Sequence, residues 1–295
     1  MDLNQITTIL DKPKHDQVAW RRSLLLQEQS GTAIEVVSFV WNAMCENTAA
    51  LNAVDRRKLR RSLIDKRRQW LQDLVAKSPR SRSGDIAQRI IYGHDIGAWV
   101  EDEFADKCPD LVVKTVHKSA SLVHSPTDWD LLRTSPAPIL LTTRRRGKFS
   151  GNIVASLDLR QADTKHRHLN CKVLEAAFSF ANLYQAKMHV VFVVELSQIL
   201  RDLDIINERV SKAKVMKKVG PELERLLKPY HIPKSRVHTP VGKVGKVVAQ
   251  VSRKLNADLL VIGSYAHRAK RLVGFGNSAE RIVTKAVGDV LVVHP

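Results

Sequence analysis

Short apolar runs alternate with amphipathic stretches along the chain, and this alternation predicts parallel strands covered by helices. In the second half, apolar runs predict five strands, and apolar positions three or four residues apart predict the helices between them. The expected strands are 152–157, 188–194, 236–239, 258–263 and 290–294, and the expected helices are 168–185, 197–228, 243–255 and 278–286. This repeated order is typical of an α/β fold with helices on both faces of the sheet.

The first half repeats this pattern at a distance of about 147 residues. Residues 6–11 resemble 152–158, and both runs end in an aspartate. The further pairs of similar runs are 109–115 with 257–264, and 136–143 with 288–295. A period of this length indicates duplicated domains rather than a solenoid. We therefore expect two domains, 1–146 and 150–295, joined by the basic stretch 144–151.

Composition narrows the class of protein. Only 5% of residues are aromatic, so the core must come from aliphatic side chains, as in parallel sheets. The net charge of +18 favours anionic partners such as nucleotides or nucleic acid. Neither a membrane-spanning run nor a secretory signal is recognisable, and membrane insertion is not expected. Cys45, Cys108 and Cys171 are far apart, which indicates reduced thiols in a cytoplasmic protein.

A ligand site is expected where two strands of the second domain end. Asp158 follows the first strand and Gly263 ends the fourth, so both should face one crevice at the carboxyl edge of the sheet. A basic loop then leads to Gly276, Asn277 and Ser278, which open a helix and would form a phosphate cradle. The alternative is that this turn only caps the helix, with Ser278 as the N-cap.

Three passages resemble a known family. ADLLVIGSYAHRAKRLVGFGNSAERIVTKAVGDVLVVHP at the end of the chain resembles the closing segment of the universal stress proteins. DRRKLRRSLIDKRRQWLQ and SPTDWDLLRTSPAPILL resemble their tandem, E-type branch. The resemblance implies two tandem doubly wound five-stranded parallel-sheet domains of the adenine-nucleotide-binding, Rossmann-like type. It also implies that the closing strands pair, giving an intrachain pseudo-dimer of the two domains or a homodimer.

The resemblance also implies a nucleotide site. ATP-binding members carry Gly, two residues, Gly, nine residues, Gly and then Ser or Thr. Here Gly263 and Gly276 match, but Ala266 replaces the second glycine and Asn277 the hydroxyl residue. The residues expected to bind the nucleotide are Asp158, Val193, Ile262, Gly263, Ser264, Arg268, Gly276, Asn277 and Ser278. Among them, Asp158 would meet the adenine or ribose, and Val193 and Ile262 would flank the base.

The expected cofactor is therefore ATP or another adenine nucleotide, bound weakly and in the second domain alone. The first domain keeps Asp11 but has no glycine between residues 111 and 146, so its phosphate loop is missing. No catalytic motif or metal site is recognisable. The favoured function is a non-catalytic, ligand-responsive protein of the stress response. The alternatives are a slow ATPase and a basic nucleic-acid-binding protein.

Three further features of the sequence are a basic helical stretch, a pair of histidines and two single residues, Cys171 and Trp129. The helical stretch 55–77 holds eight Lys and Arg residues between positions 56 and 68, and it is either a solvated covering helix or a surface for nucleic acid or an anionic membrane. His166 and His168 have the spacing of metal ligands on an extended segment, but an exposed pair is the favoured interpretation. Cys171 and Trp129 are expected to pack in the core.

Overall fold

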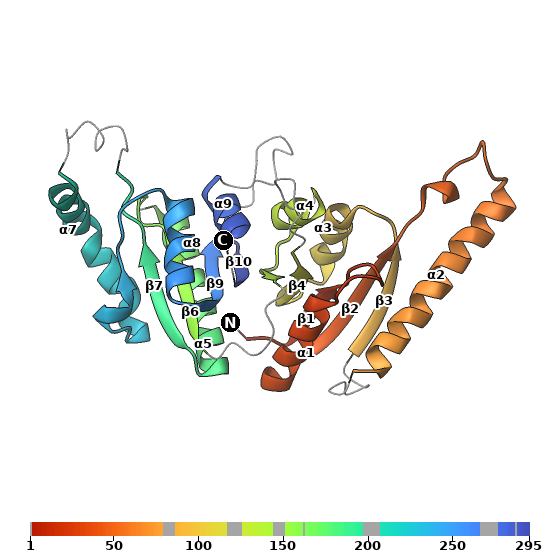
Figure 1. Ribbon diagram of the computed structural model, residues 1–295, viewed down its shortest axis with the longest axis horizontal. Coiled ribbons are helices and arrows are strands. Elements are labelled where there is room, and N and C mark those ends of the chain that lie inside the picture. The colour runs from red at the N-terminus through yellow and green to blue at the C-terminus, as the bar shows by residue number, and fades with distance from the viewer. Residues whose placement is uncertain are drawn as a thin grey trace. The chain divides into compact units, whose positions relative to one another are not determined.

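The computed structural model describes residues 2–78, 86–116, 126–143, 151–161, 163–196, 207–265, 277–286 and 288–295. The chain divides into two compact units. Residues 2–120 and 124–142 form the first unit, and residues 143–295 form nearly all of the second. Each unit alternates strands and helices (Figure 1).

The first unit is a parallel sheet with helices between successive strands. Its strands are β1 (Gln5–Ile9), β2 (Ala33–Val40), β3 (Ile86–Tyr92), β4 (Leu111–Thr115) and β5 (Ile139–Thr142). Its helices are α1 (Val18–Ser30), the 3-10 turn η1 (Ala43–Cys45), α2 (Ala53–Ala76), α3 (Ile96–Asp106) and α4 (Pro126–Thr134). The strands lie in the order β3-β2-β1-β4-β5, and each of the four neighbouring pairs is parallel.

The second unit has the same plan. Its strands are β6 (Asn152–Leu157), β7 (Lys187–Phe192), β8 (Val237–His238), β9 (Ala257–Gly263) and β10 (Asp289–Val293), in the order β8-β7-β6-β9-β10. Its helices are α5 (Thr164–Tyr184), α7 (Glu208–Leu227), η2 (Lys228–Tyr230), η3 (Lys234–Arg236), α8 (Val244–Lys254) and α9 (Asn277–Lys285). The predicted fold class, two tandem doubly wound parallel-sheet domains, is confirmed.

Right-handed crossovers fix which face each helix covers. In this strand order the first two connections of a unit run in one direction and the last two return in the other. The helices therefore lie on both faces, with α3 against α4 in the first unit and α8 against α9 in the second. The central strands are buried on both sides, as the continuous burial of β4 and the nearly continuous burial of β9 show.

The structure changes three expectations. Helix α5 begins at Thr164 rather than at residue 168, because the side chain of Asp163 accepts a hydrogen bond from the backbone N–H of His166 and caps the helix. His166 and His168 consequently lie on a helix and not on an extended segment. Cys171 is half-buried on the same helix, so it is not a core residue. Trp129 is 5% exposed, as the packing interpretation requires.

The long helix α2 covers the outer part of the first sheet. Its side chains Leu71 and Val75 enter the core beside Trp20 and Ile86, while Trp70 and Leu74 pack against the same cluster. The covering role predicted for this helix is therefore correct. Within the described residues, no helix combines the length and the apolar character that crossing a membrane requires.

Candidate functional site

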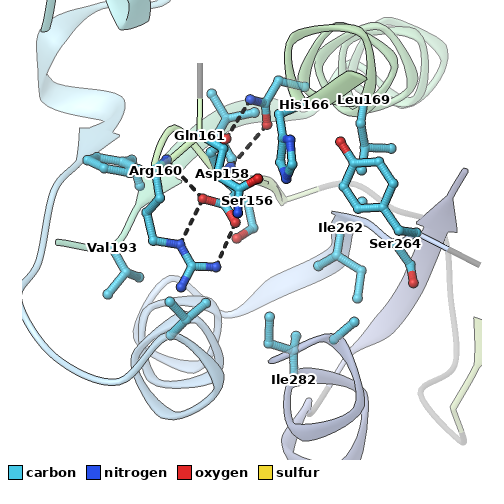
Figure 2. Close-up of a pocket in the computed structure, with 17 residues that line it drawn as sticks. Ser156, Asp158, Arg160, Gln161, His166, Leu169, Val193, Ile262, Ser264 and Ile282 are labelled. Carbon is cyan, nitrogen blue, oxygen red and sulfur yellow. Dashed lines mark hydrogen bonds and ion pairs between the residues drawn. The ribbon is translucent and has the colours of Figure 1, made fainter. Parts of the chain in front are cut away.

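A cavity of about 290 Å³ opens in the second unit where β6 and β9 end (Figure 2). The chain order reverses direction between these neighbouring strands, which is where open parallel sheets bind ligands. Its lining residues come from β6, β7, β9, α5, α8, α9 and the turns between them. They are Ser156, Leu157, Asp158, Arg160, Gln161, His166, Leu169, Asn170, Phe192, Val193, Val244, Ile262, Gly263, Ser264, Tyr265, Ala279 and Ile282.

Apolar side chains form the inner wall of the cavity, and polar ones gather at one side of it. Val193 and Ile262 are only 3% and 2% exposed, and Leu169 and Ile282 are equally buried beside them. The polar groups include Asp158, which follows β6, and Arg160 and Gln161 in the same turn. An apolar wall with a few polar groups is typical of sites for small planar molecules, and the volume lies at the low end for such sites.

Gly263 owes its identity to a close approach between the sheet and a helix. A Cβ atom at this residue would lie 2.7 Å from Cγ of Leu169 on α5 and 2.8 Å from one of its methyl carbons. The glycines with a left-handed backbone in the described chain are elsewhere, at residues 31 and 242. Gly263 therefore lets α5 lie close to the end of β9, and this contact shapes the cavity wall.

The carboxylate of Asp158 is held by an arginine that the sequence reasoning did not single out. Arg160 donates from Nε to Oδ1 at 2.9 Å and from Nη2 to Oδ2 at 2.7 Å, and it also reaches Glu195 at 2.9 Å. Burial alone would raise the pKa of Asp158, but the hydrogen bonds and charge of Arg160 lower it below the ordinary value. Asp158 is therefore an ionised acceptor that already has a cationic partner.

The backbone of Asp158 is fixed from the other side by Asn170 on α5. The amide oxygen of Asn170 accepts from the backbone N–H of Asp158 at 3.0 Å, and its amide nitrogen donates to the Asp158 carbonyl at 2.7 Å. These two hydrogen bonds leave little freedom in the turn after β6. The position of the carboxylate is thus set by the fold rather than by a ligand.

Two hydroxyl groups at the cavity lack hydrogen-bond partners in the described part of the chain. They are Oγ of Ser264, a residue that is 4% exposed, and the phenol oxygen of Tyr265. Burial, followed by the charges of Asp163 and Asp158, raises the pKa of Tyr265 to about 12, so the phenol keeps its proton. A buried hydroxyl without a partner costs free energy, which a polar ligand group would recover.

His166 completes this side of the cavity. Its Nδ1 lies 2.6 Å from the carboxylate of Asp163, and its ring packs on that of Tyr265 with 4.8 Å between the centroids. The site therefore combines a fixed carboxylate, an arginine, a histidine and a phenol around an apolar wall. Among the described residues, no group of three or more His, Cys, Asp or Glu side chains is placed to hold a metal ion.

The structure brings five of the nine predicted site residues to this cavity. They are Asp158, Val193, Ile262, Gly263 and Ser264. Arg268 and Gly276 lie outside the described residues. Asn277 and Ser278 begin α9, so Ser278 is the second residue of the helix and not its N-cap.

Sequence reasoning missed Arg160, His166 and Tyr265. Arg160 had a readable signal, because an arginine two residues after the predicted strand-end aspartate can turn back to it. His166 lies three residues before Leu169, and a helix begun at its Asp163 cap would have placed both on one face. Tyr265 carried no comparable signal, because its ring position depends on α5.

At the corresponding place in the first unit, a lysine lies beside the aspartate. Lys114 pairs with Ile9 in the sheet as Ile262 pairs with Ser156, so Lys114 is the counterpart of Ile262. Its ammonium lies 3.9 Å from the carboxylate of Asp11, and both side chains are almost fully buried. The first unit thus keeps the aspartate of the site and supplies its own cation there.

Comparison with known proteins agrees with this duplicated plan. A family model described as "Universal stress protein family" matches residues 168–294. Universal stress protein E of Photorhabdus laumondii is 23% identical over 98% of this chain and 94% of its own length. Universal stress protein E of Escherichia coli K12 is 22% identical over 97% of this chain and 92% of its own. The chain is thus similar over nearly its whole length to universal stress proteins of the E type, and the family model covers most of its second unit.

Solved structures of universal stress proteins share the fold. A putative universal stress protein from Pseudomonas aeruginosa superposes with a TM-score of 0.67 at 19% identity, covering 99% of this chain and 94% of that one. One from Archaeoglobus fulgidus gives a TM-score of 0.66 at 13% identity and covers 98% of each chain. Both likenesses span the two units, so the duplicated fold is shared over the full length.

Proposed function

We propose that this protein is a universal stress protein, a non-catalytic, ligand-responsive protein of the cytoplasmic stress response that binds an adenine nucleotide weakly in its second domain. The observation that carries the proposal is the pair of unpartnered hydroxyls, Ser264 Oγ and Tyr265 OH, at an apolar cavity. A planar heteroaromatic base offers both an apolar face for the wall and polar edges for such hydroxyls. A purely apolar ligand would leave these groups unsatisfied.

In the proposed binding mode the base lies between Val193 and Ile262, and Asp158 accepts from a ribose hydroxyl. Support for this comes from the burial of the two aliphatic side chains and from the fixed position of the carboxylate beside them. Arg268, Gly276, Asn277 and Ser278 are the proposed phosphate contacts, on the sequence motif alone. The start of α9 at Asn277 provides a helix N-terminus, which favours anions.

Weak affinity follows from two features. Arg160 already occupies both oxygens of Asp158, so a ribose hydroxyl must share the carboxylate with a charged donor. Ala266 and Asn277 depart from the family motif, and together they are expected to weaken ATP about five- to a hundredfold. The proposal confines the ligand to the second domain because Lys114 fills the counterpart site in the first.

Calorimetric titration of the full chain with ATP at one fixed salt concentration tests the proposal. The variant Asp158→Ala should lose binding, and the matched variant Asp73→Ala, on the exposed side of α2, should keep it. The double variant Ala266→Gly, Asn277→Ser should bind more tightly than the natural protein. Equal affinity of the Asp158→Ala and Asp73→Ala variants would show that this cavity is not the ATP site.

Assembly is a separate part of the proposal. The closing strands β5 and β10 are short and apolar, and the family resemblance implies that such strands pair, within one chain or between two. Light scattering on the full chain measures whether a homodimer forms. Expression of residues 1–146 and 150–295 as separate, stable monomers that do not associate would contradict pairing of the domains.

A further inference from the structure

The positive charge of the first unit is concentrated on one helix. Residues 1–146 hold 23 Lys and Arg against 18 Asp and Glu, a net charge of +5. Helix α2 alone holds eight Lys and Arg against three Asp, which is also +5. The rest of this half is therefore neutral, and its positive field originates on α2.

Most of these bases face solvent. The exposed ones are Arg57, Lys58, Arg60, Arg61, Lys66 and Arg68. Arg57 and Arg61 are one helical turn apart, which spaces them by about 6 Å along the axis. Neither forms an ion pair with a residue in the described ranges, whereas Arg68 pairs with Asp65. Two adjacent unpaired guanidinium groups at regular spacing suit the phosphates of a polyanion better than a single small anion.

Apolar side chains are exposed at the N-terminal end of the same helix. Trp41, Met44 and Val54 are 42%, 41% and 63% exposed, and they are three of the four large apolar side chains exposed in the described chain. The ring of Trp41 packs against that of His94 with 4.5 Å between the centroids. In Figure 1 the turn η1 lies near this end of α2, and the two elements are in contact.

The helix is anchored to its own unit, so the backbone positions that carry the exposed bases are set before any partner arrives. Arg67 donates to the Phe39 carbonyl at 2.7 Å and to Oγ of Ser38 at 3.0 Å. The guanidinium of Arg60 lies 4.0 Å from the centroid of the Tyr92 ring. A preformed surface loses little conformational entropy on binding.

We propose that this α2 surface, the exposed bases of α2 together with Trp41, Met44 and Val54, binds single-stranded nucleic acid. The guanidinium groups of Arg57 and Arg61 contact successive phosphates. The indole of Trp41, supported from behind by His94, stacks on a base. This combination of a basic track and an exposed aromatic ring is how proteins hold single strands without reading their sequence.

Two other partners fit the surface less well. An anionic membrane takes up a helix through its apolar face, and the apolar face of α2 is buried against its own sheet. An acidic protein would satisfy the bases but would not require an exposed stacking platform. Asp55, an acid at this end of α2, is engaged with the N-cap residue Asn52.

Fluorescence anisotropy with a labelled 20-nucleotide poly(dT) strand, measured on the full chain at several salt concentrations, tests the proposal. The variant Arg57→Gln, Arg61→Gln should lower the slope of log affinity against log salt by about 1.4. Trp41→Ala should weaken binding about five- to a hundredfold. The control Lys217→Gln, Lys218→Gln removes the same charge from exposed positions of α7 and should leave the affinity within about twofold.

Each other outcome overturns the proposal. An equal loss in the α7 control would show a diffuse effect of the net charge of +18. Binding that is unaffected by Trp41→Ala would remove the stacking contact. Binding to phosphatidylserine vesicles without binding to poly(dT) would assign the α2 surface to membranes. Because ATP is not a component of these titrations, their result does not depend on the nucleotide site of the second domain.

Discussion

Substitution of Gly263 by alanine tests whether the close approach of α5 to β9 determines this glycine. The added methyl would lie 2.7 Å from Cγ of Leu169, an atom that cannot rotate away as the end of a long side chain could. Overpacking of this kind costs about 1–3 kcal/mol. The lower entropy of the unfolded alanine chain returns about 0.4–1 kcal/mol. We therefore expect Gly263→Ala to lower the free energy of unfolding by about 1–2 kcal/mol.

A second substitution makes this cost specific to the contact. Leu169→Ala alone should cost about 2–5 kcal/mol, because it removes a buried side chain. In the double variant the new methyl occupies part of the space left by Leu169. Its loss in free energy of unfolding should therefore be about 1–2 kcal/mol smaller than the sum of the losses of the two single variants. Gly93→Ala after β3, where a Cβ would meet nothing within 4 Å and the backbone is not left-handed, is the matched control and should be slightly stabilising.

Urea unfolding separates the two units because of where the tryptophans lie. All five, at residues 20, 41, 70, 99 and 129, are in the first unit, so their fluorescence reports on it alone. Far-UV circular dichroism reports on both. Gly263→Ala should shift the transition seen by circular dichroism. A variant as stable as the natural protein, or strictly additive costs in the double variant, would refute the packing argument.

Three further predictions concern charged and titratable groups. Arg160→Gln frees the carboxylate of Asp158 for a ligand. Calorimetry should therefore show adenosine binding about fivefold more tightly, about 1 kcal/mol, with a smaller gain for ATP. An unchanged adenosine affinity would exclude competition between Arg160 and the ligand for this carboxylate. Lys114→Met removes the buried ammonium beside the carboxylate of Asp11 and should destabilise the first unit by about 3 kcal/mol. Urea unfolding followed by tryptophan fluorescence measures this change, and an unchanged midpoint would contradict it. Ring nitrogens of His189 and His238 lie 3.0 Å apart, and burial lowers the pKa of each histidine. As the pH falls, the unfolded chain therefore takes up protons before the folded chain does. The free energy of unfolding should decrease as the pH drops below about 6.5. Replacing both histidines with glutamine should reduce the slope of the free energy of unfolding against pH by the equivalent of up to two protons. Urea unfolding followed by circular dichroism between pH 7.5 and 5 measures this slope. Equal slopes for the variant and the natural protein would contradict the prediction.

The strands were predictable because a parallel sheet buried on both faces demands continuous aliphatic runs. Strand β6 has the bounds that the pattern predicted, and β9 differs by one residue. The start of α5 was not predictable from the apolar periodicity, because it depends on the cap at Asp163, a residue outside that pattern. Helix boundaries follow from side-chain hydrogen bonds as well as from hydrophobic spacing.

The site was only partly predictable for a related reason. Asp158 and Gly263 follow from topology, since both mark strand ends at a reversal of chain order. The occupation of Asp158 by Arg160 depends on how one side chain folds back, and no periodicity encodes that. Lys114 carried a visible signal, a charged residue within a buried strand, but identifying Asp11 as its partner required the register of β1 against β4.

With the pair of Lys114 and Asp11 in the first unit alone, the proposed function would make the stability of the two units depend differently on ligand concentration. The ammonium of Lys114 is covalently attached to the chain, so its effective concentration at Asp11 is constant. The stabilisation that it gives to the first unit therefore does not depend on small molecules in solution. The second unit, if it binds a free ligand, becomes more stable only as that ligand accumulates. One chain would then combine a half of constant stability with a half whose melting temperature follows ligand supply.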